Sequence, residues 1–116
     1  MSEVHVVSRH FIKSGKLGDF ELLASTARQM ARDKEPGTLS YRWYFHATST
    51  TFVVLHRYEN AAAFMQHVAN FKEIHRALDD LCETRIEVFG CLSPEAQRDL
   101  AEFGVVVFSP HGGEHP

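Results

Sequence analysis

The order in which strand-like and helix-like segments follow one another constrains the fold of this chain most. Stretches rich in β-branched and aromatic residues are typical of strands. Four such stretches occur, at residues 4–13, 38–46, 51–58 and 85–89. Apolar residues three or four positions apart indicate helices at 17–30 and 61–81, the second either continuous or bent near Asn70. The resulting order predicts two split β-α-β units, which is the ferredoxin-like arrangement of the α+β class, with a four-stranded antiparallel sheet and helices on one face.

A helix and a short strand are expected after this repeat. Ser93 can cap a helix that has Pro94 at its first position, and Gly104 can end it. Residues 105–108 then form a brief apolar run that suits a strand. The remaining residues, 109–116, are rich in Gly, Pro and His and are expected to be mobile.

Length and composition indicate one domain. The chain has 116 residues, of which 44% are hydrophobic, and this suits a single core. We expect that domain to span residues 1–108, with 93–108 as an appended segment. Cys82 and Cys91 are expected as free thiols, because a single disulfide is improbable in a chain with no secretion signal.

The charge pattern argues against nucleic acid or a membrane as a partner. The formal net charge is −3, with 12 basic and 15 acidic residues spread along the chain, so no basic stripe can neutralise phosphates. No apolar run approaches the roughly 20 residues that span a bilayer. A basic start followed by an apolar run is also lacking, and we expect a cytoplasmic protein.

The second strand indicates how the molecule assembles. Its side chains alternate between two sets, Leu39, Tyr41, Trp43 and Phe45 on one face and Ser40, Arg42, Tyr44 and His46 on the other. Helices on one side of a four-stranded sheet leave the other side bare, so either set exposes aromatic surface. Patches of this kind usually mark an interface. We therefore expect a homodimer whose sheets face each other.

Four short patterns carry a resemblance to a known family. They are Gly15-x-x-x-x-Phe20, Glu35-Pro36-Gly37-x-x-x-Tyr41, Phe52-x-x-x-His56-x-Tyr58-x-Asn60 and Ala63-x-x-x-His67. Over roughly residues 4–90 the chain resembles the antibiotic biosynthesis monooxygenase family. The resemblance implies a dimeric α+β barrel. It also implies, as for several members, oxidation of quinols or polyphenols by molecular oxygen with no bound cofactor.

The chain departs from the family pattern at two positions. The middle of the third strand, where the family commonly has glutamate, holds His56, and its end, where tryptophan is common, holds Tyr58. Haem-degrading relatives need an asparagine on the first strand and a tryptophan in the pocket. This chain has Ser8, Arg9 and His10 on the first strand and its single tryptophan on the second, so haem cleavage is not expected.

The candidate site follows from what a phenolic substrate would need. Its proton must be held or removed, and the resulting anion must be stabilised in a dry, aromatic-lined pocket. His56 is the candidate base, because histidine titrates near neutrality. Tyr41, Trp43, Tyr58 and His75 are the candidate substrate-binding residues. The alternatives are that the histidines are hydrogen-bonded core or interface residues and that the aromatic residues only pack.

No metal site is predicted. His67 and His75 would lie about 12 Å apart along a continuous helix, which is too far to share one ion. His111 and His115 have helical spacing, but two glycines and a proline around them argue against a helix. The sequence also lacks the motifs of phosphate-binding loops and dinucleotide sites, and no cofactor is expected.

Two functional hypotheses remain at this point. The first is a cofactor-independent, monooxygenase-like protein that oxidises a small aromatic or quinol substrate with O2. The second is a non-catalytic dimeric ligand-binding or stress-response module on the same barrel, since this scaffold hosts unrelated functions. The first requires His56, His75 and Tyr41 to line one cavity.

Overall fold

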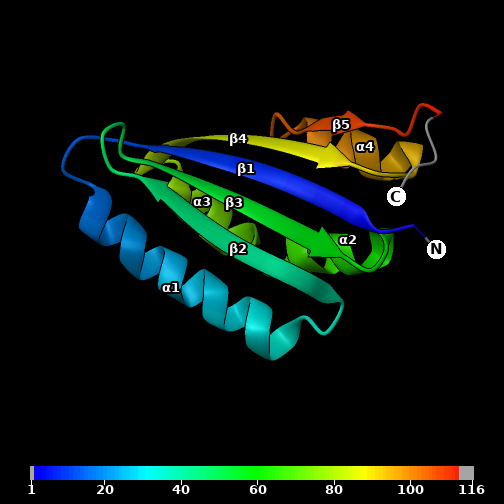
Figure 1. Cartoon of the computed structure of the whole chain (residues 1–116), viewed down its shortest axis with the longest axis horizontal. Helices are drawn as coiled ribbons and strands as arrows, with labels where there is room; N and C mark the ends of the chain where they lie inside the picture. Colours follow the sequence, from blue (N-terminus) through cyan, green and yellow to red (C-terminus); the bar gives the residue numbers. More distant parts are fainter. Residues whose placement is uncertain (1, 113–116) are drawn as a thin grey trace.

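Five strands form one sheet in the computed structural model, which describes residues 2–112. The strands are β1 (Val4–Ile12), β2 (Thr38–His46), β3 (Thr51–Tyr58), β4 (Cys82–Phe89) and β5 (Val106–Phe108). Their order is β2-β3-β1-β4-β5, antiparallel except for the parallel pair β4 and β5 (Figure 1). The expected mobile tail at 109–116 lies partly outside the described residues.

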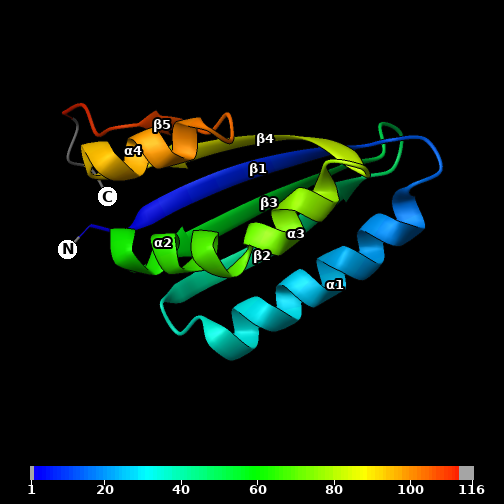
Figure 2. The same ribbon diagram turned by 180° about the vertical axis from the view of Figure 1, so that it is seen from behind.

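The helices gather on one face of this sheet (Figures 1 and 2). They are α1 (Leu17–Lys34), α2 (Ala61–Asn70), α3 (Lys72–Leu78) and α4 (Pro94–Ala101). The predicted ferredoxin-like α+β fold is therefore confirmed, with α4 and β5 added at the C-terminal end. No helix in the described part of the chain is long and apolar enough to cross a membrane.

Local chemistry explains where several elements begin and end. Asn60 has extended backbone, and its Oδ1 accepts from the backbone N of Ala63 at 2.9 Å, which caps α2. The predicted bend near Asn70 is a break at Phe71 between α2 and α3. Strand β4 starts three residues before the predicted position, because Cys82 already pairs with Ile12 of β1. Pairing with a neighbouring strand thus extends β4 beyond its β-branched segment.

One residue of β2 breaks the predicted alternation. The register of β2 on β3 shifts between Thr38 and Ser40, so Leu39 is the extra residue of a bulge and is 45% exposed. From Tyr41 onward the alternation is regular.

The structure decides which face of β2 is covered. Tyr41 and Trp43 lie on the helix-covered face, whereas Tyr44 and His46 lie on the open face. The open face also exposes Leu55 of β3 and Phe89 of β4.

The apolar core is divided into two clusters. One contains Val4, Val6 and Leu100 among others, and the second contains Phe20, Phe52 and their neighbours. The inward-facing residues of β1 between these clusters are polar, namely Ser8 and His10. Ser8 and His10 therefore lie where the apolar packing of the core is interrupted.

Candidate functional site

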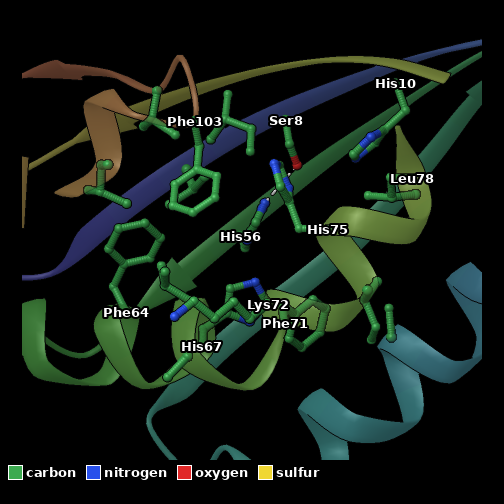
Figure 3. Close-up of a pocket in the computed structure, with 18 of the residues that line it drawn as sticks. Ser8, His10, His56, Phe64, His67, Phe71, Lys72, His75, Leu78 and Phe103 are labelled. Carbon is green, nitrogen blue, oxygen red and sulfur yellow. Dashed lines mark hydrogen bonds between the residues drawn. The ribbon is translucent and has the colours of Figure 1, made fainter. Parts of the chain in front are cut away.

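A cavity of about 510 Å³ lies between the sheet and the helices. Its walls come from β1, β2, β3, β4 and all four helices, and most of the lining is apolar. In Figure 3, side chains of the strands and side chains of α2 and α3 meet across it. A cavity of this size and character fits a small organic ligand.

Four of the five predicted site residues line this cavity. Tyr41 and His56 are direct partners on β2 and β3, with ring centroids 5.2 Å apart, and Trp43 lies one step along the same face. His75 reaches the cavity from α3. Tyr58 does not line it: its side chain is 0% exposed and belongs to the apolar core. Its place at the end of β3, beneath Phe64 of α2, accounts for this burial.

His56 is the centre of a buried hydrogen-bonded chain. Its Nε2 lies 2.9 Å from Ser8 Oγ, and its Nδ1 lies 2.7 Å from the Tyr58 hydroxyl (Figure 3 shows the first of these bonds). Burial, together with the nearby His67 and His10, lowers the pKa of His56 well below its ordinary value. Burial also raises the pKa of Tyr58. Both groups are therefore neutral near pH 7.

Because His56 and Tyr58 are both neutral, the hydrogen atoms in the hydrogen-bonded chain from Tyr58 through His56 to Ser8 can be placed. The buried Tyr58 hydroxyl has His56 Nδ1 as its hydrogen-bond partner, and an unsatisfied buried O–H is costly. Tyr58 therefore donates to Nδ1, and His56 carries its hydrogen on Nε2 and donates to Ser8 Oγ. The Ser8 hydroxyl hydrogen is left free to point into the cavity that Ser8 lines.

A second polar group pairs Glu35 with His67. Glu35 lies in the loop between α1 and β2, and its Oε1 accepts from His67 Nδ1 at 2.8 Å and from Thr38 Oγ1 at 3.0 Å. Its Oε2 accepts from Asn70 Nδ2 at 3.2 Å. Burial alone would raise the pKa of Glu35, but the hydrogen bonds from His67, Asn70 and Thr38 and the charge of His67 outweigh it and hold the pKa below its ordinary value. Glu35 is thus a buried carboxylate facing His67.

Gly37 allows this pair to form. A Cβ at residue 37 would lie 2.5 Å from the Cβ of Ala63 on α2, so only glycine permits this approach. The Glu35-Pro36-Gly37 and Ala63-x-x-x-His67 patterns contribute to the family resemblance, but they do not predict that Glu35 and His67 meet in the site. No periodicity connects residues 32 positions apart.

His10 and Trp43 form an aromatic wall near α1. Their rings stack with centroids 6.2 Å apart at 10°, and Phe20 lies against both. Burial, with a contribution from His75, lowers the pKa of His10 to about 4. His10 is therefore neutral, and its Nδ1 lies 3.1 Å from Thr84 Oγ1.

The appended C-terminal segment closes one side of the cavity. Leu100, Phe103 and Val105 line it, and the ring of Phe103 packs edge-on against His75 at 5.4 Å. Since β5 pairs with β4, this segment covers the sheet of its own chain.

Clusters of metal-binding side chains and disulfides are both absent from the described part of the chain. No group of three or more His, Cys, Asp or Glu side chains within residues 2–112 is arranged to hold an ion. His115 lies outside the described residues. Cys82 and Cys91 are both free, as expected.

Comparisons with known proteins agree with this architecture. The family model for antibiotic biosynthesis monooxygenases matches residues 3–76. A search of curated proteins finds no match. Among solved structures, MupZ from Pseudomonas fluorescens has a TM-score of 0.82 at 20% identity, over 100% of this chain and 96% of MupZ. A conserved protein from Methanosarcina mazei has a TM-score of 0.68 at 25% identity, over 76% of this chain and 91% of that protein.

SnoaB, a cofactor-independent oxygenase from Streptomyces nogalater, has a TM-score of 0.67 at 19% identity, over 80% of this chain and 96% of SnoaB. The likenesses to MupZ and SnoaB show a shared fold, and the one to MupZ extends over α4 and β5. The match of the family model over more than half of the chain goes further than the fold. The chain belongs to the antibiotic biosynthesis monooxygenase family.

Proposed function

We propose that the protein is a cofactor-independent, monooxygenase-like enzyme that oxidises a small aromatic, quinol-type substrate with O2. The observation that carries the proposal is the common cavity, which Tyr41, His56 and His75 line together with mostly apolar neighbours. Family membership and the printed description of SnoaB as a cofactor-independent oxygenase support the same reaction class.

The proposed reaction balances without an added reductant. One quinol and one O2 give one hydroxyquinone and one water, because the substrate supplies all four electrons. The phenolic proton is released to solvent, and the resulting anion is electron-rich enough to react with O2. The protein then needs to hold the anion and limit its contact with water, which a mostly apolar cavity with a few polar groups favours.

His56 stays in the proposal, but it acts through Ser8 as a positioning residue and not as the predicted base, because both of its ring nitrogens are already hydrogen-bonded. By donating to Ser8, His56 leaves the Ser8 hydroxyl free to donate to the substrate oxygen and stabilise its negative charge. Tyr58 supports this arrangement from the core. Tyr41, Trp43 and His75 are the proposed contacts of the aromatic ring.

A homodimer in the cytoplasm is part of the same proposal. The open sheet face carries Tyr44 and Leu55, which are 50% and 43% exposed, together with Phe89. Sheet-to-sheet association would bury this surface. Sedimentation at micromolar concentration should give twice the mass of one chain, and a single-chain mass would contradict the dimer.

Oxygen uptake tests the proposed activity. We expect metal-stripped protein to consume O2 with at least one member of a panel of quinols and polyphenols. His56→Gln and Ser8→Ala should each slow this uptake at least tenfold, about 1.4 kcal/mol of transition-state stabilisation, because Ser8→Ala removes the donor to the anion and His56→Gln removes the imidazole that orients it. His111→Gln, outside the cavity lining, is the matched histidine control and should behave as wild type. Uptake no faster than the protein-free background across the panel would contradict the proposal.

One observation favours the second candidate, a ligand-binding module without catalysis. Both ring nitrogens of His56 are already hydrogen-bonded within the protein, as in a structural histidine. This candidate predicts that quinols bind in the cavity and are recovered unchanged in the presence of O2.

A further inference from the structure

The exposed part of the cavity wall lies between the appended segment and the helices α2 and α3. Most of the residues that line the cavity are buried or half-buried. The exposed ones are Ala69 of α2, Lys72 of α3, and Asp99, Glu102 and Phe103 of the appended segment. We call these five residues the mouth, because a ligand in solvent reaches the cavity first through them.

The ring of Phe103 stands in this mouth. It reaches from the appended segment into the cavity and packs edge-on against His75 of α3, with centroids 5.4 Å apart at 87° (Figure 3). Phe103 is also 45% exposed. The ring therefore lies across the gap between the appended segment and α3, with the cavity on one side and solvent on the other.

The backbone that carries Phe103 is fixed. Gly104 has a φ of +73°, a left-handed conformation that glycine adopts readily, and its N donates to Ala101 O at 3.0 Å. Val105 N donates to Leu100 O at 3.3 Å, which completes the turn that ends α4. Leu100 is only 2% exposed, so its side chain anchors this turn in the core. A change at the mouth therefore involves the Phe103 side chain rather than the whole segment.

The Phe103 side chain is held less tightly than its backbone. Its aromatic contact within residues 2–112 is the one with His75, and exposed side chains change rotamer readily. Rotation about the side-chain bonds would move the ring off His75 and widen the mouth without moving α4. Because binding that needs such a rearrangement is slower than binding to an open pocket, the ring can control entry.

We propose that Phe103 is the gate of the cavity: its ring turns away from His75 to admit a flat aromatic ligand and turns back over it, so that this side chain sets how fast ligands enter and leave. The inference rests on the ligand binding of the proposed function but not on oxidation. Phe103 lies outside residues 3–76, which match the family model, so the gate is a feature of the appended segment.

Binding kinetics test the gate without turnover. Trp43 is the only tryptophan of the chain and lines the cavity, so quenching of its fluorescence reports a quinone that binds there. The probe is 2,3-dimethyl-1,4-naphthoquinone, which is already oxidised and whose substituted ring carbons do not add thiols. In stopped-flow measurements we expect Phe103→Ala to associate with the probe at least about fivefold faster than wild type. Dissociation should be faster by a larger factor, because the ligand also loses an aromatic wall.

Two further variants separate a gate from a wall that only covers the ligand. Phe103→Leu keeps an apolar side chain but removes the ring, so both rates should rise while the affinity falls less than in Phe103→Ala. Phe108→Ala removes a ring of similar exposure from the same segment but outside the cavity lining, and it should keep the wild-type rates.

Two results would overturn the gate. The first is an unchanged association rate in both Phe103 variants, because the loss of a covering wall alters dissociation alone. The second is the lack of saturable quenching in wild type, which would show that the cavity does not take up a flat quinone. Failure of the oxidation proposal has a different signature, namely gated binding of the quinone without O2 uptake from quinols.

Discussion

The protonation of two cavity histidines, His10 and His56, affects the stability of the fold. Burial lowers the pKa of His10 from 6.5 to about 4 and that of His56 in the same direction. Below pH 6.5 the unfolded chain therefore binds more protons than the folded protein, and the free energy of unfolding falls as pH drops toward 4. Glu35 acts in a different window, because its lowered pKa means that its contribution is lost only below about pH 4.5.

Replacing His10 should reduce this pH dependence. Between about pH 7 and about pH 4.5, we expect wild type to lose on the order of 2 kcal/mol through His10 alone. His10→Asn keeps a group that can bond Thr84 but cannot be protonated, so its loss should be smaller by about that amount. Urea unfolding at the two pH values measures both. An equal loss of unfolding free energy in the two proteins would show that burial does not hold His10 neutral in the folded protein.

The positions of the site residues could be predicted from the sequence only where strand periodicity controls them. Tyr41 and His56 share the inner face because both follow the alternation of adjacent strands. The depth of Tyr58 could not be predicted, because a strand pattern gives a face but not the distance from the cavity. The Glu35–His67 pair depends on the loop after α1 meeting α2, a contact that no local pattern encodes.

At the scale of elements, the close approach of the 35–37 loop to α2 positions the buried carboxylate. Gly37→Ala would place a methyl group 2.5 Å from the Ala63 side chain. We expect it to lower the free energy of unfolding by about 1–3 kcal/mol and to weaken the contact of Glu35 with His67. Gly18→Ala in α1 has nothing within 4 Å and should be neutral or stabilising by up to about 1 kcal/mol. If Gly37→Ala and Gly18→Ala had equal effects in thermal or urea unfolding, the close approach of residue 37 to α2 would not contribute to stability.

The appended segment α4–β5 is expected to contribute to ligand binding. Phe103 closes the cavity beside His75 and is 45% exposed, so its removal should cost little stability. Phe103→Ala should weaken binding of 1-naphthol about tenfold by calorimetry, because the ligand loses an aromatic wall. Phe108→Ala is the control, since Phe108 has similar exposure and stacks on Phe89 away from the cavity. Equal affinities of the two variants would show that the segment does not enclose the ligand.

The boundaries of the elements could be predicted from the sequence more closely than the side of the sheet that the helices cover. The ranges of β2 and β3 and the break between α2 and α3 agree with the apolar periodicity and with the cap at Asn60. Which side of β2 the helices cover stayed open, because both sides carry aromatic residues. The register of β2 on β3 decides it by setting Tyr41 opposite His56.

At the scale of the whole molecule, two apolar clusters stabilise the sheet–helix interface, and between them lies a mostly apolar cavity with a few polar side chains. The opposite face of the sheet is open and exposes Tyr44, Leu55 and Phe89. The appended segment lines one side of the cavity within one chain, so the proposed dimer is not needed to supply that wall.

The most direct test of the central claim is the fate of oxygen-18 from labelled O2. The protein is incubated with the quinol panel under oxygen-18 gas, and the products are analysed by mass spectrometry. We expect wild type to form a hydroxyquinone that carries one oxygen-18 atom, and His56→Gln to form much less of it. Oxidised products without the label, or quinols recovered unchanged across the panel, would contradict it.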